Sequence, residues 1–172
     1  MPADNCAPDR QFTIVSGGQS GVDRAALDAA ISLEIPHRGW CPRGRVAEDG
    51  PLSSIYQLRE TPSANYADRT LRNVLESDGT LILHCGPITG GTRLTDRLAR
   101  KHKRPCEVLD LLLATDEESL GQVQRWLLTG QIKVLNVAGP RETHHPGIYE
   151  RALAFLAELF ALQQQKNGTN GF

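Results

Sequence analysis

The sequence predicts an α/β fold of three layers, in which helices cover both faces of a mostly parallel sheet. Short apolar runs alternate along the chain with stretches whose apolar residues recur at helical spacing. The run from Thr80 to His84 is almost continuously apolar, which is typical of a parallel strand buried on both faces. Polar, glycine-rich segments follow several of the predicted strands. These observations indicate a Rossmann-like sheet with its ligand site at the carboxyl ends of the strands.

Each element follows from its local pattern. In the first helix, the small residues Ala25 and Ala29 share one stripe, which allows close packing against a sheet. The segment 39–54 has little periodicity and is expected to be a long functional loop. The predicted strands are 12–16, 33–38, 55–59, 80–84, 107–111 and 133–137. The predicted helices are 20–32, 64–77, 94–103, 116–127 and 147–164.

The length of 172 residues suits a single domain, expected at 11–165, between a flexible arm at 1–10 and a disordered tail at 166–172. A net charge of −1 gives no global indication of nucleic acid or of an anionic membrane as a partner. The first residues contain no apolar signal segment, and no apolar run is long enough to span a membrane. The four cysteines form no C-x-x-C pair, so a reduced, cytoplasmic protein without a metal site is expected.

The stretch from Ile14 to Arg24 predicts a strand, a glycine turn and the start of a helix. Such a unit directs backbone N–H groups toward one point at the positive end of a helix, where an anion can bind. Its Gly-Gly-x-x-Gly spacing matches neither the dinucleotide fingerprint nor the Walker phosphate loop. The alternative is a tight turn that needs glycine only for its backbone angles.

Two further turns follow predicted strands. Gly90, Gly91 and Thr92 open a helix and form a second candidate anion site, although simple helix capping is an alternative. Gly139 and Arg141 follow the last strand. Because the carboxyl ends of parallel strands lie at one edge of a sheet, the three turns are expected to form one site.

Other candidates lie in or near the long loop. Trp40 could stack on a heterocycle or could equally pack the loop onto the sheet. Arg43 and Arg59 could reach ligand oxygens. Glu60 or Asp49 could serve as a general base, but no catalytic motif is present and no catalytic residue is assigned.

These segments together resemble the molybdenum cofactor carrier family. The similar stretches cover most of residues 12–160 and are 16–28, 39–51, 58–61, 77–80, 90–95 and 135–142. The family is related to the lysine-decarboxylase-like phosphoribohydrolases that activate cytokinins and to DNA-processing protein A. Those hydrolases carry P-G-G-x-G-T-x-x-E, whereas Thr95 or Asp96 stands here where their glutamate is expected. The resemblance therefore implies a crevice that binds nucleotide-like ligands, as in those hydrolases, more directly than it implies their hydrolytic activity.

The resemblance implies a carrier that binds molybdenum cofactor, a phosphorylated pterin, or a similar nucleotide-like ligand, and passes it to apo-molybdoenzymes. It also implies a homo-oligomer. The alternatives are a nucleotide hydrolase and a sensor of a nucleotide signal. The residues expected to contact the ligand are Gly17, Gly18, Gln19, Ser20, Gly21, Asp23, Arg24, Trp40, Arg43, Arg59, Glu60, Gly90, Gly91, Thr92, Gly139 and Arg141.

Overall fold

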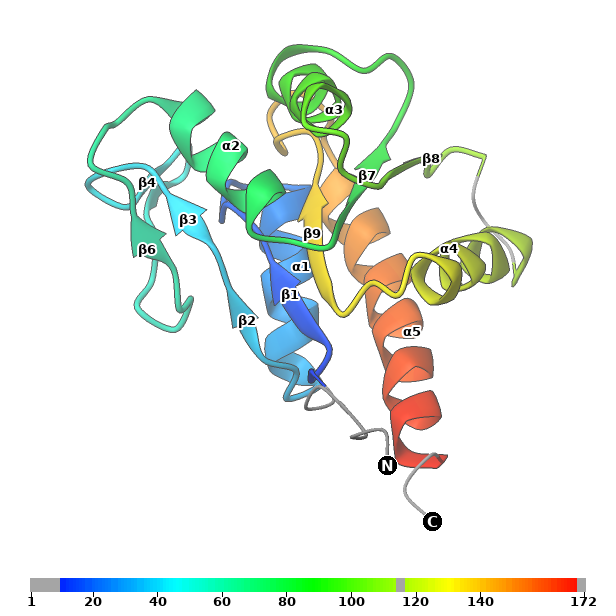
Figure 1. Cartoon of the computed structure of the whole chain (residues 1–172). Helices are drawn as coiled ribbons and strands as arrows, with labels where there is room; N and C mark the ends of the chain where they lie inside the picture. The colour runs from blue at the N-terminus through cyan, green and yellow to red at the C-terminus, as the bar shows by residue number, and fades with distance from the viewer. Residues whose placement is uncertain (1–9, 114–116, 170–172) are drawn as a thin grey trace.

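A five-stranded parallel sheet forms the centre of the protein, as a computed structural model shows for residues 10–113 and 117–169 (Figure 1). The strand order is β2-β1-β9-β7-β8, and every pairing in this sheet is parallel. The strands are β1 (Thr13–Val15), β2 (His37–Arg38), β7 (Gly79–His84), β8 (Cys106–Asp110) and β9 (Val134–Ala138). The predicted three-layer α/β fold is therefore confirmed.

Helices cover both faces of this sheet (Figure 1). On one face, α1 (Val22–Ser32), α4 (Glu117–Thr129) and α5 (Ile148–Thr169) share one hydrophobic core with the sheet. On the other face, α2 (Tyr66–Leu75) packs beside α3 (Gly90–Lys101). The alanine stripe of α1 is fully buried in the core that α1 shares with the sheet, and α1 also packs against α5. No helix in the described ranges is both long enough and apolar enough to cross a membrane.

The segment predicted as a long loop instead folds into a small lobe beside α1. It contains β3 (Trp40–Cys41), β4 (Val46–Ala47), β5 (Gly50–Pro51) and β6 (Arg59–Glu60). Strand β3 pairs in parallel with β6, and β4 pairs antiparallel with β5. Leu52 and Leu58 bury their side chains with Leu27 of α1 in a second hydrophobic cluster. We refer to residues 39–60 as the lobe.

Arg45 holds the lobe together. Its guanidinium donates to four backbone carbonyls, those of Leu52, Ser53, Tyr56 and Leu58, at distances of 2.9 to 3.4 Å. These bonds curl the chain into a turn where a strand was predicted at 55–59, so that prediction is wrong. The side chain satisfies carbonyl groups that a strand ladder would otherwise bind.

The end of the chain also differs from the prediction. Helix α5 continues to Thr169 instead of ending at residue 164. Gln165 and Lys166 are good helix formers even without an apolar stripe, whereas the propensities of Asn167, Gly168 and Thr169 do not explain the last three residues. The start of the tail predicted at 166–172 is therefore helical. Residues 1–9 of the predicted arm and 170–172 of the predicted tail lie outside the described residues.

The sheet order brings the three predicted turns together. Strand β9 lies between β1 and β7, so the turns that follow these strands leave three neighbouring positions of the same sheet edge. At the opposite edge, Asp78 accepts backbone hydrogen bonds from Lys133 at 3.0 Å and Val134 at 2.8 Å, and pairs with Arg10 at 3.2 Å. Asp78 therefore fixes the start of β7 against the start of β9.

Asp78→Ala is expected to lower the free energy of unfolding by about 1–3 kcal/mol near neutral pH, since it removes charge-assisted hydrogen bonds. Burial alone would raise the pKa of Asp78, but the bonds from Val134, Lys133 and Arg10 outweigh it and lower that pKa below its ordinary value. The stabilisation is therefore present above about pH 4 and is lost as the pH falls through the lowered pKa.

Urea unfolding of both proteins between pH 3 and pH 7 measures this difference. The control is Asp96→Ala, which removes an exposed helical pair with Arg100 and should cost only about 0.5 kcal/mol. A difference between wild type and Asp78→Ala that does not shrink in acid would contradict the assignment.

Candidate ligand-binding site

A cavity of about 210 Å³ lies where the three turns meet at the carboxyl edge of the sheet. Six of the predicted site residues line it: Gln19, Asp23, Gly91, Thr92, Gly139 and Arg141. The residues that the sequence did not indicate come mainly from α2 and from the flanks of the turns. They include Tyr66, Arg69, Thr70, Pro87, Thr89, His144 and His145. The three turns therefore share one cavity, as predicted, and α2 supplies its remaining wall.

The N-terminus of α3 is open toward this cavity. Thr89 caps the helix without a side-chain hydrogen bond, and no acidic residue lies in the first turn. A side chain added at Gly90 or Gly91 would meet no atom within 4 Å. Thr92 is 5% exposed and lines the cavity wall. This geometry leaves the positive end of a 12-residue helix available to an anion.

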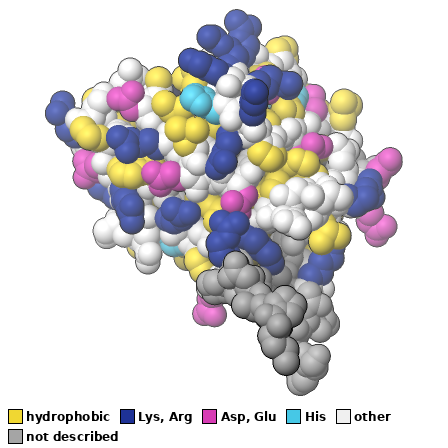
Figure 2. Space-filling model, viewed as in Figure 1, with side chains coloured by type: hydrophobic (Ala, Val, Ile, Leu, Met, Phe, Trp, Pro, Cys, Tyr) yellow, Lys and Arg dark blue, Asp and Glu magenta, His cyan; other side chains and the backbone are white. Residues whose placement is uncertain are grey.

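Basic side chains add to the positive potential around this helix. Figure 2 shows Lys and Arg side chains gathered at the top of the molecule, over the region of α3. Arg93, Arg97, Arg100 and Lys101 of α3 are exposed. Since the whole chain carries a net charge of −1, this concentration of positive charge is local. It favours the approach of an anionic ligand to the α3 side of the cavity.

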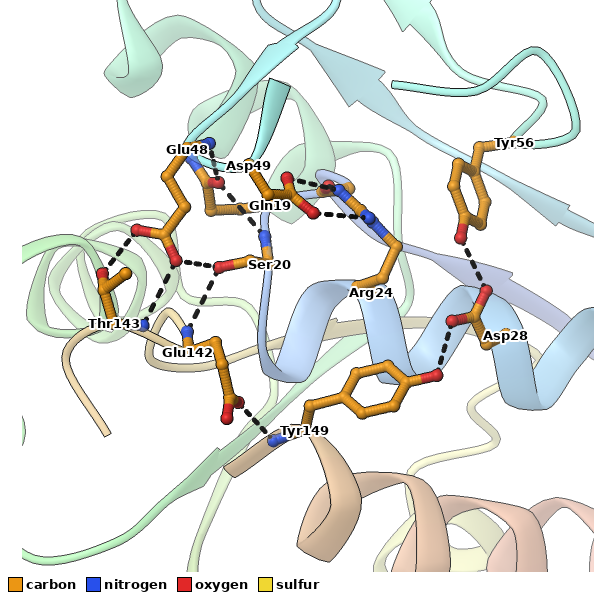
Figure 3. A network of polar contacts seen from close by, with 11 residues as sticks. Gln19, Ser20, Arg24, Asp28, Glu48, Asp49, Tyr56, Glu142, Thr143 and Tyr149 are labelled. Atoms are coloured by element: carbon orange, nitrogen blue, oxygen red, sulfur yellow. Dashed lines mark hydrogen bonds and ion pairs between the residues drawn. The ribbon is translucent and has the colours of Figure 1, made fainter. Parts of the chain in front are cut away.

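The first glycine turn, in contrast, is closed by the protein itself. A side chain at Gly21 would lie 2.3 Å from the carbonyl oxygen of Pro140. Figure 3 shows the Glu48 carboxylate of the lobe facing Ser20 and Thr143; Ser20 donates a hydrogen bond to it, and the Thr143 hydroxyl donates another at 2.6 Å. Gly18, Ser20 and Gly21 consequently do not line the cavity. A carboxylate of the chain therefore already binds Ser20, in the turn where the sequence predicted an anion site.

Glu48 is held as a carboxylate in this position. Burial by itself raises the pKa of Glu48, but the hydrogen bonds from Ser20 and Thr143, together with the charge of Arg141, lower it overall. The hydroxyl of Ser20 also accepts a hydrogen bond from the backbone N–H of Glu142 at 3.2 Å. These contacts join the lobe, the turn before α1 and the segment after β9.

Gln19 lies in the same turn but lines the cavity, and the residue is only 4% exposed. Its Oε1 accepts hydrogen bonds from the backbone N–H of Ser20 at 3.1 Å and of Glu48 at 2.8 Å. These two donors fix the orientation of the amide, since only its oxygen can accept. Within the described part of the chain, Gln19 Nε2 has no hydrogen-bond partner.

Asp23 and Arg69 form a buried ion pair beside Gln19. Arg69 Nη1 lies 2.8 Å from Asp23 Oδ2, and the side chains are 14% and 4% exposed. The guanidinium crosses directly over Gly17, where an added Cβ would lie 1.4 Å from Arg69 Nη1. Gly17 is therefore required for this packing, although it does not line the cavity. The pair compensates the charge of Asp23, which would otherwise repel an anionic ligand.

Tyr66 and Arg141 border the opening of the cavity. The Arg141 guanidinium carbon lies 5.1 Å from the centre of the Tyr66 ring, and that of Arg69 lies 5.9 Å from it. Tyr66 is 36% exposed, and both guanidinium groups lie over its ring. Tyr66 and Arg69 are three residues apart on the predicted helix, so their shared face was a signal in the sequence. The local pattern did not show that this face of the helix points toward the three turns that follow the strands.

The remaining predicted site residues lie elsewhere. The backbone of Trp40 is fixed to α2 by two hydrogen bonds with the side chain of Asn73, at 2.8 and 3.1 Å. The guanidinium groups of Arg72 and Arg59 lie over the Trp40 ring. This arrangement supports the alternative in which Trp40 packs the lobe onto the domain. Arg24, Arg43, Arg59 and Glu60 are likewise not among the residues that line the cavity.

Local contacts explain these other positions. Arg24 binds the Gly18 carbonyl and pairs with Asp49 at 3.0 Å. Glu60 accepts a hydrogen bond from the backbone N–H of Gly44 at 2.6 Å. Neither carboxylate considered as a general base, Asp49 or Glu60, therefore reaches the cavity. Among the described residues there is also no cluster of three His, Cys, Asp or Glu side chains able to hold a metal ion.

Asp23→Ala is expected to destabilise the protein by about 3–5 kcal/mol, because it leaves the buried Arg69 guanidinium without its counter-charge. The matched control is Asp49→Ala, which removes the partner of Arg24 at a side chain that is 50% exposed and should cost less than about 1 kcal/mol. Urea unfolding at neutral pH measures both values. Equal losses in the two variants would show that the Asp23–Arg69 pair is not effectively buried.

Comparison with known proteins identifies the family of this chain. Residues 14–160 match the model of the circularly permutated YpsA SLOG family. A crystal structure from Syntrophus aciditrophicus SB, described as a "Putative molybdenum carrier protein", is 45% identical, covers 88% of this chain and 95% of its own, and superposes with a TM-score of 0.84. No curated protein matches the chain. The family resemblance in the sequence is thus confirmed, and the chain belongs to the circularly permutated YpsA SLOG family.

Proposed function

We propose that this protein binds a small phosphorylated heterocycle and carries it without cleaving it. The observation that supports this most directly is the N-terminus of α3, which has no side-chain cap hydrogen bond and is open at Gly90 and Gly91 on the edge of the cavity. The phosphate binds the backbone N–H groups of this helix, with Arg141 nearby. The heterocycle lies beside Tyr66 and the flat guanidinium group of Arg141, both of which line the cavity.

The ligand that fits this proposal is molybdenum cofactor, a pterin with one phosphate. The relative described as a molybdenum carrier supports this choice. A cavity of about 210 Å³ is smaller than the ~300–1,000 Å³ typical for drug-sized ligands, so part of the ligand extends past the opening. Delivery to apo-molybdoenzymes, a homo-oligomeric state and a cytoplasmic location are further predictions from the sequence and belong to this proposal.

The carboxylates around the cavity favour binding over hydrolysis. Thr95, at the position of the missing glutamate, donates its hydroxyl hydrogen bond to the Gly91 carbonyl at 3.0 Å. Asp96 pairs with Arg100 outside the cavity. Asp23 is the carboxylate that lines the cavity in the described structure, and Arg69 already binds it. A general acid or base needs a carboxyl group within reach of the ligand, and this arrangement provides none that is free.

Gly91→Asp is expected to weaken binding at least tenfold, about 1.4 kcal/mol, because it places a negative charge at the proposed phosphate position. The substitution should not unfold the protein, since the position is open and an acidic residue stabilises a helix N-terminus. Gly91→Asn is the matched control with the same shape and no charge, and its affinity should stay within about threefold of wild type.

Calorimetric titration with AMP and, under nitrogen, with isolated molybdenum cofactor measures these affinities. Chromatography of the AMP mixtures tests for released adenine, and none is expected. Multiple-turnover release of adenine that disappears in Asp23→Asn would establish the hydrolase alternative instead. Failure of the wild-type protein to bind either compound would overturn the proposal.

A further inference from the structure

The inner wall of the cavity carries hydrogen-bond donors that the protein leaves unused. Gln19 Nε2 points away from the two backbone groups that hold Oε1, and no described residue accepts from it. Gln19 is 4% exposed, so bulk water does not replace the missing partner. A buried donor without a partner costs about 1–3 kcal/mol, which makes an acceptor supplied by a ligand energetically favourable.

Arg69 contributes a second donor on the same wall. Its Nη1 binds Asp23, while its Nε is buried and has no acceptor within the described residues. Arg69 and Gln19 both line the cavity and come from different elements, α2 and the turn before α1. Asp23, the nearby acceptor, is already bound to Arg69. Two buried donor groups beside the cavity, on Gln19 and Arg69, therefore have no acceptor among the described residues.

We propose that Gln19 and Arg69 select a ring carbonyl, so that the site takes an oxo-heterocycle such as a 6-oxopurine or a 4-oxopterin in preference to adenine. This inference rests on the proposed function and deepens it. A carbonyl oxygen has two lone pairs and can accept from more than one donor. Adenine carries an amino group at the corresponding ring position. Its N–H donors would face the N–H donors of Gln19 and Arg69, and no hydrogen bond could form between them. A site built to bond one group rejects the analogue that lacks it.

The experiment compares IMP, GMP and AMP, which share one ribose phosphate and differ in the ring edge. Titration calorimetry of the full chain is expected to give IMP and GMP at least tenfold tighter binding than AMP. IMP and GMP should agree within about threefold, because the 2-amino group of GMP is not part of the proposed contact.

Gln19→Glu tests the residue directly. The carboxylate keeps the oxygen that accepts from Ser20 and Glu48, and replaces the Nε2 donor by an acceptor. IMP affinity is expected to fall at least tenfold while AMP affinity stays within about threefold, which removes the preference. Gln124→Glu is the matched control, since Gln124 also has a buried unpaired Nε2 but lies on α4, away from the cavity. It should leave both affinities unchanged.

The outcomes separate this inference from the proposed function. Equal binding of IMP and AMP by the wild-type protein would overturn the carbonyl selection and leave the phosphate site standing. A preference for IMP that survives Gln19→Glu would show that Gln19 does not provide it. If none of the three nucleotides binds and molybdenum cofactor does not bind either, both the inference and the proposed function are wrong.

Discussion

A buried ion pair joins the two helical layers across the end of the sheet. Asp23 belongs to α1 on one face, and Arg69 belongs to α2 on the other. The guanidinium passes over the backbone of Gly17, where no side chain could fit. This contact sets the distance between α2 and the turns, and so defines the inner wall of the cavity. The Nε of Arg69 is buried and has no partner among the described residues.

The electrostatics of the two candidate anion sites differ for a structural reason. At the start of α1, the backbone N–H of Val22 donates to the Pro140 carbonyl, Glu48 binds Ser20 in the preceding turn, and the acidic Asp23 lies in the first turn of the helix. The N-terminus of α3 has neither, and its glycines are open. A helix N-terminus binds an external anion only where no internal one already satisfies it. The N-terminus of α3 is therefore the more open of the two, although the first turn has more glycine.

Much of this organisation could be predicted from the sequence. The apolar runs of β7 and β9 indicated a buried parallel sheet, and the turns after β1, β7 and β9 were expected at one edge. What the sequence could not supply was the position of α2, since a helical pattern shows which residues share a face but not what that face contacts. Tyr66 and Arg69 were missed for this reason. Glu48 was missed as a partner of Ser20 because the two are 28 residues apart.

The contacts of Glu48 give the lobe an influence that its position does not suggest. No residue of 39–60 lines the cavity. The Glu48 carboxylate nevertheless binds both Ser20 in the turn before α1 and Thr143 after β9. The backbone N–H of Glu48 also anchors the Gln19 amide. Homologous proteins that differ only in the lobe would therefore differ in ligand affinity, so sequence variation far from the bound molecule can tune how firmly it is held.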